Sequence, residues 1–231
     1  MKVDFQALRA AASNGIKFEF SEDRHEYTVN GEVVPSVTQI LTESGYSNYA
    51  DLEAMMPAVL ERKRQLGKLV HQAIHFYNEN DLDEETQVKP YPIIEARLNG
   101  YKAFEAATGY KPLVNEGRQI AEAYGMKFAM CFDSIGLCHG KPPYWLVDIK
   151  NASGQPQRSW AIQTAAYALG QKFLPKIPYR ALTRVIVQLF DDGTFRLFSS
   201  NDQNSKIFGR DDFAVWQAAL CLAIDKRNYR L

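Results

Sequence analysis

An aspartate and a lysine stand two residues apart at the end of an apolar segment, Trp145 to Lys150. Side chains alternate between the two faces of a strand, so Asp148 and Lys150 should share one face, while Val147 and Ile149 face a core. Unpaired buried charge is costly, so the two charges should pair with each other or with a bound group. For this pair alone, a salt bridge at a strand end, worth about 0–1 kcal/mol, is the simpler explanation.

A second aspartate widens the chemistry that this pair could support. Asp133 precedes Asp148 by fifteen residues, which suits adjacent strands joined by the segment from Gly136 to Pro143. Two carboxylates can hold a hard cation such as Mg²⁺ or Mn²⁺, which completes its shell with water and substrate phosphate. The ammonium of Lys150 could then orient water and stabilise charge during attack on phosphorus. The expected chemistry is phosphodiester hydrolysis.

Two expected helices carry further polar side chains toward this group. Gln163 and Tyr167 lie four residues apart in a helix expected over residues 158–172, and should share one face with Trp160. Upstream, Gly67 would allow close approach of a backbone or phosphate one turn before His71, which could be a ligand or a base. Taken singly, His71 fits a core histidine and Gln163 with Tyr167 fits a surface pair.

A zinc site is the alternative chemistry for the first of these helices. His71 and His75 have the spacing of a zinc-binding pair, but Gln72 stands where a metalloprotease carries its general-base glutamate. The spacing alone therefore gives little support to zinc.

Hydrophobic periodicity and turn signals predict the elements that position these residues. The core elements are a long helix from Asp51 to about Asn78 that Pro57 kinks or starts, an acidic loop at Glu79 to Glu85, a helix from Ile93 to Thr108, strands at Leu113–Ala121, Met126–Leu137 and Tyr144–Lys150, a hairpin at Leu182–Phe190 and Thr194–Ser199, and a last helix capped by Asp211 or Asp212 and running through Ile224. Ahead of them are expected a helix from Phe5 to Ala12, a strand at Lys17 to Phe20, a hairpin around Asn30-Gly31, and a helix with a Ser36-Gln39 capping box that ends at Gly45.

Composition limits the class of protein. The chain has 231 residues, 46% of them hydrophobic, and a formal net charge of zero, which suits one domain and neither indicates nor excludes a nucleic-acid partner. The segment Met1 to Phe5 has no apolar signal region and no stretch suits a membrane span, so we expect a cytoplasmic protein. Three unpatterned cysteines predict reduced thiols and no four-thiolate metal site.

In their order along the chain, these residues resemble the RecB-like branch of the PD-(D/E)XK nuclease superfamily, which includes phage recombination exonucleases. The family motifs are Gly-x-x-x-His on a helix, a strand Glu, a strand Asp, Asp-x-Lys, and Gln-x-x-x-Tyr on a helix. The matching positions are Gly67 with His71, Glu116, Asp133, Asp148 with Lys150, and Gln163 with Tyr167. A hairpin with His25-Glu26-Tyr27 and a helix start at Pro35-Ser36-Val37-Thr38 are similar to segments ahead of the family core. The chain departs from the family at Met130-Cys131-Phe132, where a Gly-Thr pair is usual, and at Asn151, where Thr is usual.

The resemblance implies a fold and a set of site residues. The fold would be α/β (α+β), with a restriction-endonuclease-like αβββαβ core, a mixed central sheet flanked by helices, and an N-terminal hairpin and helix as an appendage. Residues 1–50 would form this appendage and residues 51–231 the helices and nuclease core of a single domain. One or two Mg²⁺ or Mn²⁺ ions would be held by Asp133, Asp148, the carbonyl of Ile149, His71 and Glu116. Lys150 would position the attacking water, and DNA would contact Gln163, Tyr167, Arg158, Arg64 and Lys68.

The implied function is that of a metal-dependent DNA nuclease, with an exonuclease acting on DNA ends in recombination or repair favoured. Its partners would be DNA and, for a phage-encoded protein in the host cytoplasm, a single-strand annealing protein or another recombination factor. Relatives that form rings leave a homo-oligomer as an open alternative. A different class of function, a nuclease-fold module that binds DNA or protein with little or no cleavage, also stays open. Iron-sulfur relatives need four cysteines around the core, so no cluster is expected.

Overall fold

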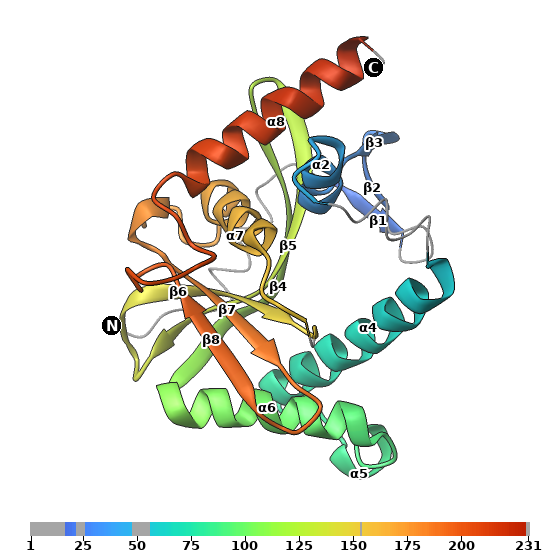
Figure 1. Ribbon diagram of the computed structural model, residues 1–231, viewed down its shortest axis with the longest axis vertical. Helices are drawn as coiled ribbons and strands as arrows, with labels where there is room; N and C mark the ends of the chain where they lie inside the picture. The colour runs from blue at the N-terminus through green and yellow to red at the C-terminus, as the bar shows by residue number, and fades with distance from the viewer. Residues whose placement is uncertain (1–16, 22–25, 48–55, 153, 230–231) are drawn as a thin grey trace.

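A five-stranded mixed sheet lies at the centre of the protein (Figure 1). The computed structural model describes residues 17–21, 26–47, 56–152 and 154–229. The strands follow one another in chain order: β4 (Tyr110–Ala123), β5 (Met126–Cys138), β6 (Lys141–Lys150), β7 (Thr183–Leu189) and β8 (Phe195–Ser199). Only β6 and β7 run parallel, because a helix crosses over between them. β4 and β5 form a long hairpin that extends beyond the other strands (Figure 1).

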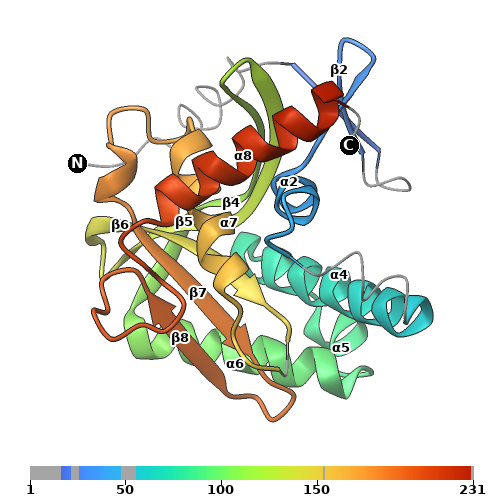
Figure 2. The ribbon, with the colours of Figure 1, turned by 45° about the horizontal axis from the view of Figure 1, so that its top comes forward.

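Helices cover both faces of this sheet. On one face lie α4 (Pro57–Glu79) and α6 (Pro92–Thr108), and on the other α7 (Arg158–Gly170) and α8 (Asp212–Tyr229) (Figure 2). Short helices at Glu84–Gln87 (α5) and Tyr179–Ala181 (η1) lie in connections. Val147 and Ile149 pack in the cluster under α4 and α6, whereas Leu146 packs in the cluster under α7 and α8. The alternation expected along β6 is confirmed, and both of its faces are core.

The order α6, β4, β5, β6, α7, β7 is the α-β-β-β-α-β order expected from the sequence. A mixed α/β fold with helices flanking a mixed sheet is therefore confirmed. The hairpin of β7 and β8 also forms, with its turn at Gly193. Assignment to the restriction-endonuclease-like fold in particular stays a prediction.

A small antiparallel sheet and one helix precede this core. This N-terminal segment consists of β1 (Glu19–Ser21), β2 (Glu26–Val29), β3 (Glu32–Val34) and α2 (Val37–Glu43). Asn30 and Gly31 have φ of 53° and 82°, as a type I′ turn requires, and Ser36 and Gln39 form the expected capping box. The Ala129 N–H donates to the Pro35 carbonyl at 2.8 Å, which attaches this segment to β5. The helix expected at Phe5 to Ala12, and His25, lie outside the described residues.

Two connections and the end of the last helix differ from the sequence prediction. The acidic tract is not one loop: α4 continues through Glu79, and the Asp83 carboxylate accepts from the N–H groups of Glu85 and Thr86 to begin α5. The link between β5 and β6 is a tight turn at His139 and Gly140, both at positive φ, so β6 begins earlier than expected. The last helix runs past Ile224 to Tyr229. Propensity and capping residues mark such boundaries only to within a few residues.

The long helix begins with Pro57 in its first turn, where the missing N–H needs no partner, and so follows one of the two alternatives expected for this proline. Residues 51–55 lie outside the described part. None of the described helices is both long and apolar enough to cross a membrane. Cys131, Cys138 and Cys221 are all free thiols.

Candidate metal-binding site

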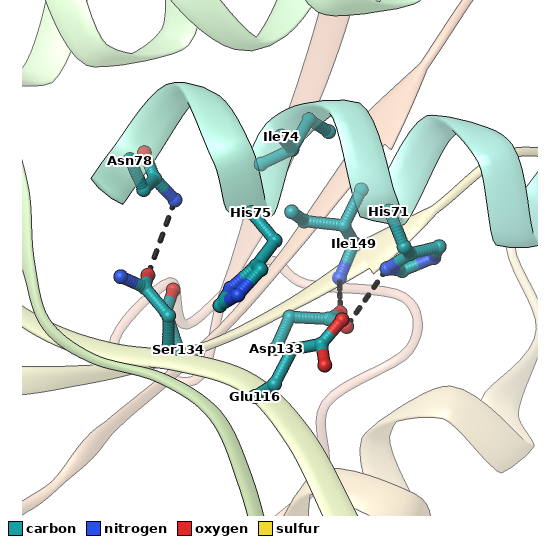
Figure 3. A pocket seen from close by; sticks show the side chains of 9 residues that line it. His71, Ile74, His75, Asn78, Glu116, Asp133, Ser134 and Ile149 are labelled. Atoms are coloured by element: carbon teal, nitrogen blue, oxygen red, sulfur yellow. Dashed lines mark hydrogen bonds and ion pairs between the residues drawn. The ribbon is translucent and has the colours of Figure 1, made fainter. Parts of the chain in front are cut away.

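A side chain from α4 and one from β5 meet beside the central sheet. His71 Nδ1 lies 2.9 Å from Asp133 Oδ1, and the Ile149 N–H donates to Asp133 Oδ2 at 2.5 Å. Figure 3 shows these two contacts at a small cavity into which Glu116 also points. The chain thus brings together His71, Asp133, Glu116 and Ile149, four of the five residues expected to hold a metal.

The fifth, Asp148, lies beside this cavity in a second polar chain. Lys150 Nζ is 2.7 Å from Asp148 Oδ2 in an ion pair and donates to Gln163 Oε1 at 2.8 Å. The Gln163 amide in turn donates to Tyr167 Oη at 2.6 Å. β5 and β6 are adjacent antiparallel strands, as expected from Asp133 and Asp148. The pairing Asp148–Lys150–Gln163 joins the strand end to α7.

The pairing between β4 and β5 is interrupted at the position of the carboxylates. Glu116 has φ of +46°, and the paired residues pass from Asn115 opposite Ser134 to Gly117 opposite Phe132, without a Glu116–Asp133 pair. A residue other than glycine at such a φ lowers the stability of the fold by about 1–2 kcal/mol. Backbone strain of this kind concentrates at functional sites, where it re-aims a side chain.

This strain leads to a stability prediction. We expect Glu116→Gly to be more stable than Glu116→Ala by about 0.5–1 kcal/mol, because only glycine adopts positive φ without a steric cost. Urea unfolding of the two variants measures the difference. Glu122, exposed on the same strand with ordinary φ, supplies the control, where alanine should be the more stable replacement. The same order at both positions would show that Glu116 is not strained.

The segment Met130-Cys131-Phe132, where the nucleases that the sequence resembles usually have a Gly-Thr pair, is accommodated by small residues around it. A Cβ on Gly117 would lie 2.0 Å from the Phe132 ring, so the phenyl group occupies the space above that glycine. Gly170 on α7 likewise leaves room for Met130. The bulky side chains therefore pack against α7 without needing space at Asp133.

Charge and burial shift the pKa values of the two aspartates in opposite directions. Burial alone would raise the pKa of Asp133, but the charge and hydrogen bond of His71, the Ile149 N–H and Lys150 together hold it below its usual value. Burial, reinforced by the charge of Asp133, raises the pKa of Asp148, and Lys150 offsets this only in part. Burial favours neutral His71, yet the nearby aspartates raise its pKa above the usual value. Asp148 is thus a buried carboxylate short of positive charge.

These donors fit a hard divalent cation. They comprise the half-buried carboxylate of Asp133 and the buried carboxylate of Asp148 on adjacent strands, together with the main-chain carbonyl of Ile149, and such oxygens suit Mg²⁺ or Mn²⁺. Within the described residues, no three His, Cys, Asp or Glu side chains gather closely enough to make a metal site by themselves. A cation here would therefore complete its shell with water and substrate, which is the usual situation for Mg²⁺.

The residues expected to contact DNA are divided between two places. Gln163 and Tyr167 join the site, whereas Arg158 donates to the Ile207 carbonyl at 2.6 Å and pairs with Asp212. Arg64 and Lys68 are exposed on α4 and precede His71 at helical spacing.

Two expectations for residues near this group are changed. Trp160 does not share a surface with Gln163; it packs with Ile186 and Ile207, because α7 is buried on nearly all sides between the sheet and α8. A Cβ on Gly67 would meet nothing within 4 Å, so no backbone of the described residues approaches this glycine.

Four further polar residues line the cavity beside Asp133 and were not assigned to it from the sequence: His75, Asn78, Asn115 and Ser134 (Figure 3). His75 had been considered only as half of a zinc pair. Its position one turn after His71 could have indicated that it lines the same cavity, because residues four apart share a helix face. The Asn78 amide donates to Asn115 Oδ1 at 3.2 Å, so these residues connect α4 to β4.

Comparison with known proteins adds no relative: no family model matches the chain, and no curated protein matches it.

Proposed function

We propose that this protein is a metal-dependent DNA nuclease that hydrolyses phosphodiester bonds, and that it acts on DNA ends as an exonuclease in recombination or repair. The observation that carries the proposal is the arrangement of Asp133, Asp148 and Lys150. The half-buried Asp133 and the buried Asp148 lie on adjacent strands, beside a lysine whose ammonium is held by Asp148 and Gln163. Its resemblance to the Asp and Asp-x-Lys motifs of RecB-like PD-(D/E)XK nucleases, and the αβββαβ element order, support the same proposal.

The chain's own residues have separate tasks in this mechanism. Asp133 and Asp148 would hold one or two Mg²⁺ or Mn²⁺ ions, with the Ile149 carbonyl, Glu116 and His71 as further donors. When bound, the cation polarises the phosphate and neutralises charge on the leaving oxygen. His71 donates to Asp133 and so fixes the orientation of that carboxylate.

Lys150 supplies the second part of the mechanism. Its ammonium, held in place by Gln163 Oε1, orients water for in-line attack on phosphorus and stabilises the negative charge that develops on the phosphoryl oxygens. Gln163 is itself fixed by Tyr167. Solvent supplies the proton that the leaving oxygen takes up.

A basic stripe on α4 supports DNA as the substrate. Arg64, Lys68, His71 and His75 follow one another at spacings of four, three and four residues, which places them along one side of the helix. Arg64 and Lys68 on this side of the helix would track a phosphate backbone toward the carboxylates. Arg64 also lies 3.5 Å from Glu61, and so it can hold its position on the exposed side of α4.

The proposal predicts a metal-dependent pattern of cleavage. End-labelled linear duplex, linear single-stranded DNA and closed circular duplex are each incubated with the protein in Mg²⁺, in Mn²⁺ and in chelator. We expect linear DNA to be degraded in either metal, circles to survive, and chelator to stop the reaction. Cutting of circles would replace the exonuclease with an endonuclease.

Two other results of this assay would overturn more of the proposal. Cleavage in chelator would remove the metal from the mechanism. Binding of DNA without cleavage in any metal would favour the rival function, a nuclease-fold module that binds DNA or protein without cutting it.

A further inference from the structure

A second and larger cavity lies between the N-terminal segment and the core. Its volume is about 230 Å³, and β1, β2, α2, β4, β5 and α7 contribute to its wall. Its lining includes the side chains of Phe20, Tyr27, Arg118, Cys131, Gln163 and Tyr167. The cavity exists because the Pro35 carbonyl and Ser36 attach the small sheet to Ala129 of β5.

This cavity adjoins the candidate metal-binding site through two side chains. Gln163 lines it and also accepts the hydrogen bond from Lys150 at 2.8 Å. Arg118 lines it and lies 3.4 Å from Glu116 Oε2. A group held in the cavity would therefore lie next to the phosphate that Lys150 and the carboxylates act on.

The wall has the chemistry of a site for a flat aromatic ligand. The Arg118 guanidinium lies over the Phe20 ring, 4.7 Å from its centroid, and the Phe20 and Tyr27 rings are 4.6 Å apart. Ala129, Val37 and Met130 are buried and apolar. Aromatic rings and guanidinium planes are the groups on which proteins stack unpaired bases.

Hydroxyl, thiol and amide groups accompany this apolar surface, and they come from Tyr27, Ser36, Thr38, Cys131, Gln163 and Tyr167. Thr38 Oγ1 accepts a long hydrogen bond of 3.5 Å from Gln163, and Tyr167 Oη accepts another from the same amide. Arg118 is the single cation among the residues that line the cavity, and Glu116 already pairs with it. A phosphate group would find little net positive charge here, whereas a neutral base with hydrogen-bonding edges matches both the wall and its rim.

We propose that this cavity receives one unpaired nucleobase of the DNA strand being cut. The inference rests on the proposed nuclease function and adds to it a determinant of substrate structure. Since a paired base cannot enter, the strand must be single-stranded or frayed at this nucleotide before cleavage. Seating the base fixes the neighbouring phosphate beside Lys150, so the cavity contributes to positioning rather than to bond cleavage.

Abasic substitution tests the proposal directly. Single-stranded oligonucleotides carry one abasic nucleotide, moved in turn through the positions around the cleaved bond, and kcat/KM is measured in Mg²⁺. For the native protein we expect a drop of about 10- to 100-fold at one position only, the size of a lost base-stacking contact. Equal rates at every position would overturn the base site and leave the nuclease function intact.

Variants assign the effect to this cavity. Phe20→Ala should cleave the normal oligonucleotide as slowly as the native protein cleaves the abasic one, with no further loss on the abasic one. Thr38→Trp, an exposed rim position, should give the same result by filling the cavity even if Phe20→Ala folds poorly. Tyr91→Ala, an exposed aromatic outside the cavity wall, is the control and should keep the native preference. Retention of the preference by both cavity variants would contradict the proposal.

A binding arm separates failure of the base site from failure of the nuclease function. If no oligonucleotide is cut, the proposed function is wrong, and an oligonucleotide containing 2-aminopurine decides the question of the cavity. Quenching of its fluorescence by the native protein but not by Phe20→Ala supports a base site. Identical fluorescence with both proteins overturns it.

Discussion

Replacement of Lys150 by alanine should lower the rate of Mg²⁺-dependent DNA cleavage by about 10³-fold while DNA binding changes little. The size of the loss is that seen when a pre-positioned electrostatic donor is removed from an active site. Lys150 is held between Asp148 Oδ2 at 2.7 Å and Gln163 Oε1 at 2.8 Å, so no other side chain takes its place. Binding should persist, because Lys150 is one cation among many that contact phosphates. Its removal should reduce the slope of log binding constant against log salt concentration by at most about one.

The controls address folding as well as chemistry. Lys150→Met keeps most of the aliphatic stem and should lose activity equally, which separates loss of charge from loss of packing. Lys141→Ala, an exposed lysine at the start of the same strand, should retain the native rate. Single-turnover cleavage and thermal unfolding are measured on all four proteins. Native turnover by folded Lys150→Ala would remove Lys150 from the mechanism.

Replacement of Asp212 by alanine should destabilise the protein by about 3–5 kcal/mol, the cost of removing one partner from a buried ion pair. Asp212 is fully buried at the start of α8, where its Oδ2 lies 2.8 Å from Arg184 and its Oδ1 pairs with Arg158. The Gly209 N–H also donates to Oδ1 at 3.0 Å. Without this carboxylate, two guanidinium groups would face each other, and that of Arg184 is almost completely buried.

Urea unfolding measures this loss, which is a large part of the roughly 5–15 kcal/mol that stabilises a typical domain. Asp225→Ala, an exposed aspartate on the same helix, should change stability by no more than about 0.5 kcal/mol. A loss of less than about 1 kcal/mol for Asp212→Ala would show that the two arginines find other partners. The folded fraction of this variant should cleave DNA at the native rate, because Asp212 contacts none of the residues proposed to bind the metal or to position the water.

Much of the fold could be predicted because the signals are local. Asn30-Gly31 dictates a tight hairpin, Ser36 and Gln39 cap a helix, and the alternation along β6 assigns its two faces. The neighbouring positions of Asp133 and Asp148 followed from a short connection between two strands. Such features depend on residues close in sequence, where sterics and capping decide the outcome.

The remaining features depend on contacts between distant segments. The positive φ of Glu116 arises where β4 pairs with β5, and a single strand's composition does not encode it. Arg158 was expected at DNA, but Asp212, fifty-four residues later, takes its guanidinium; Asp212 itself had been assigned only to a helix cap. The cavity beside Gln163 likewise forms only when the N-terminal sheet docks on β5.

The structure of the protein with Mn²⁺, located by its anomalous scattering, tests the proposed metal site. We predict a peak coordinated by carboxylate oxygens of both Asp133 and Asp148 and lost in the Asp148→Asn variant. Absence of Mn²⁺ from both carboxylates, or a peak held by His71 and His75 alone, would contradict the proposed site and with it the nuclease mechanism.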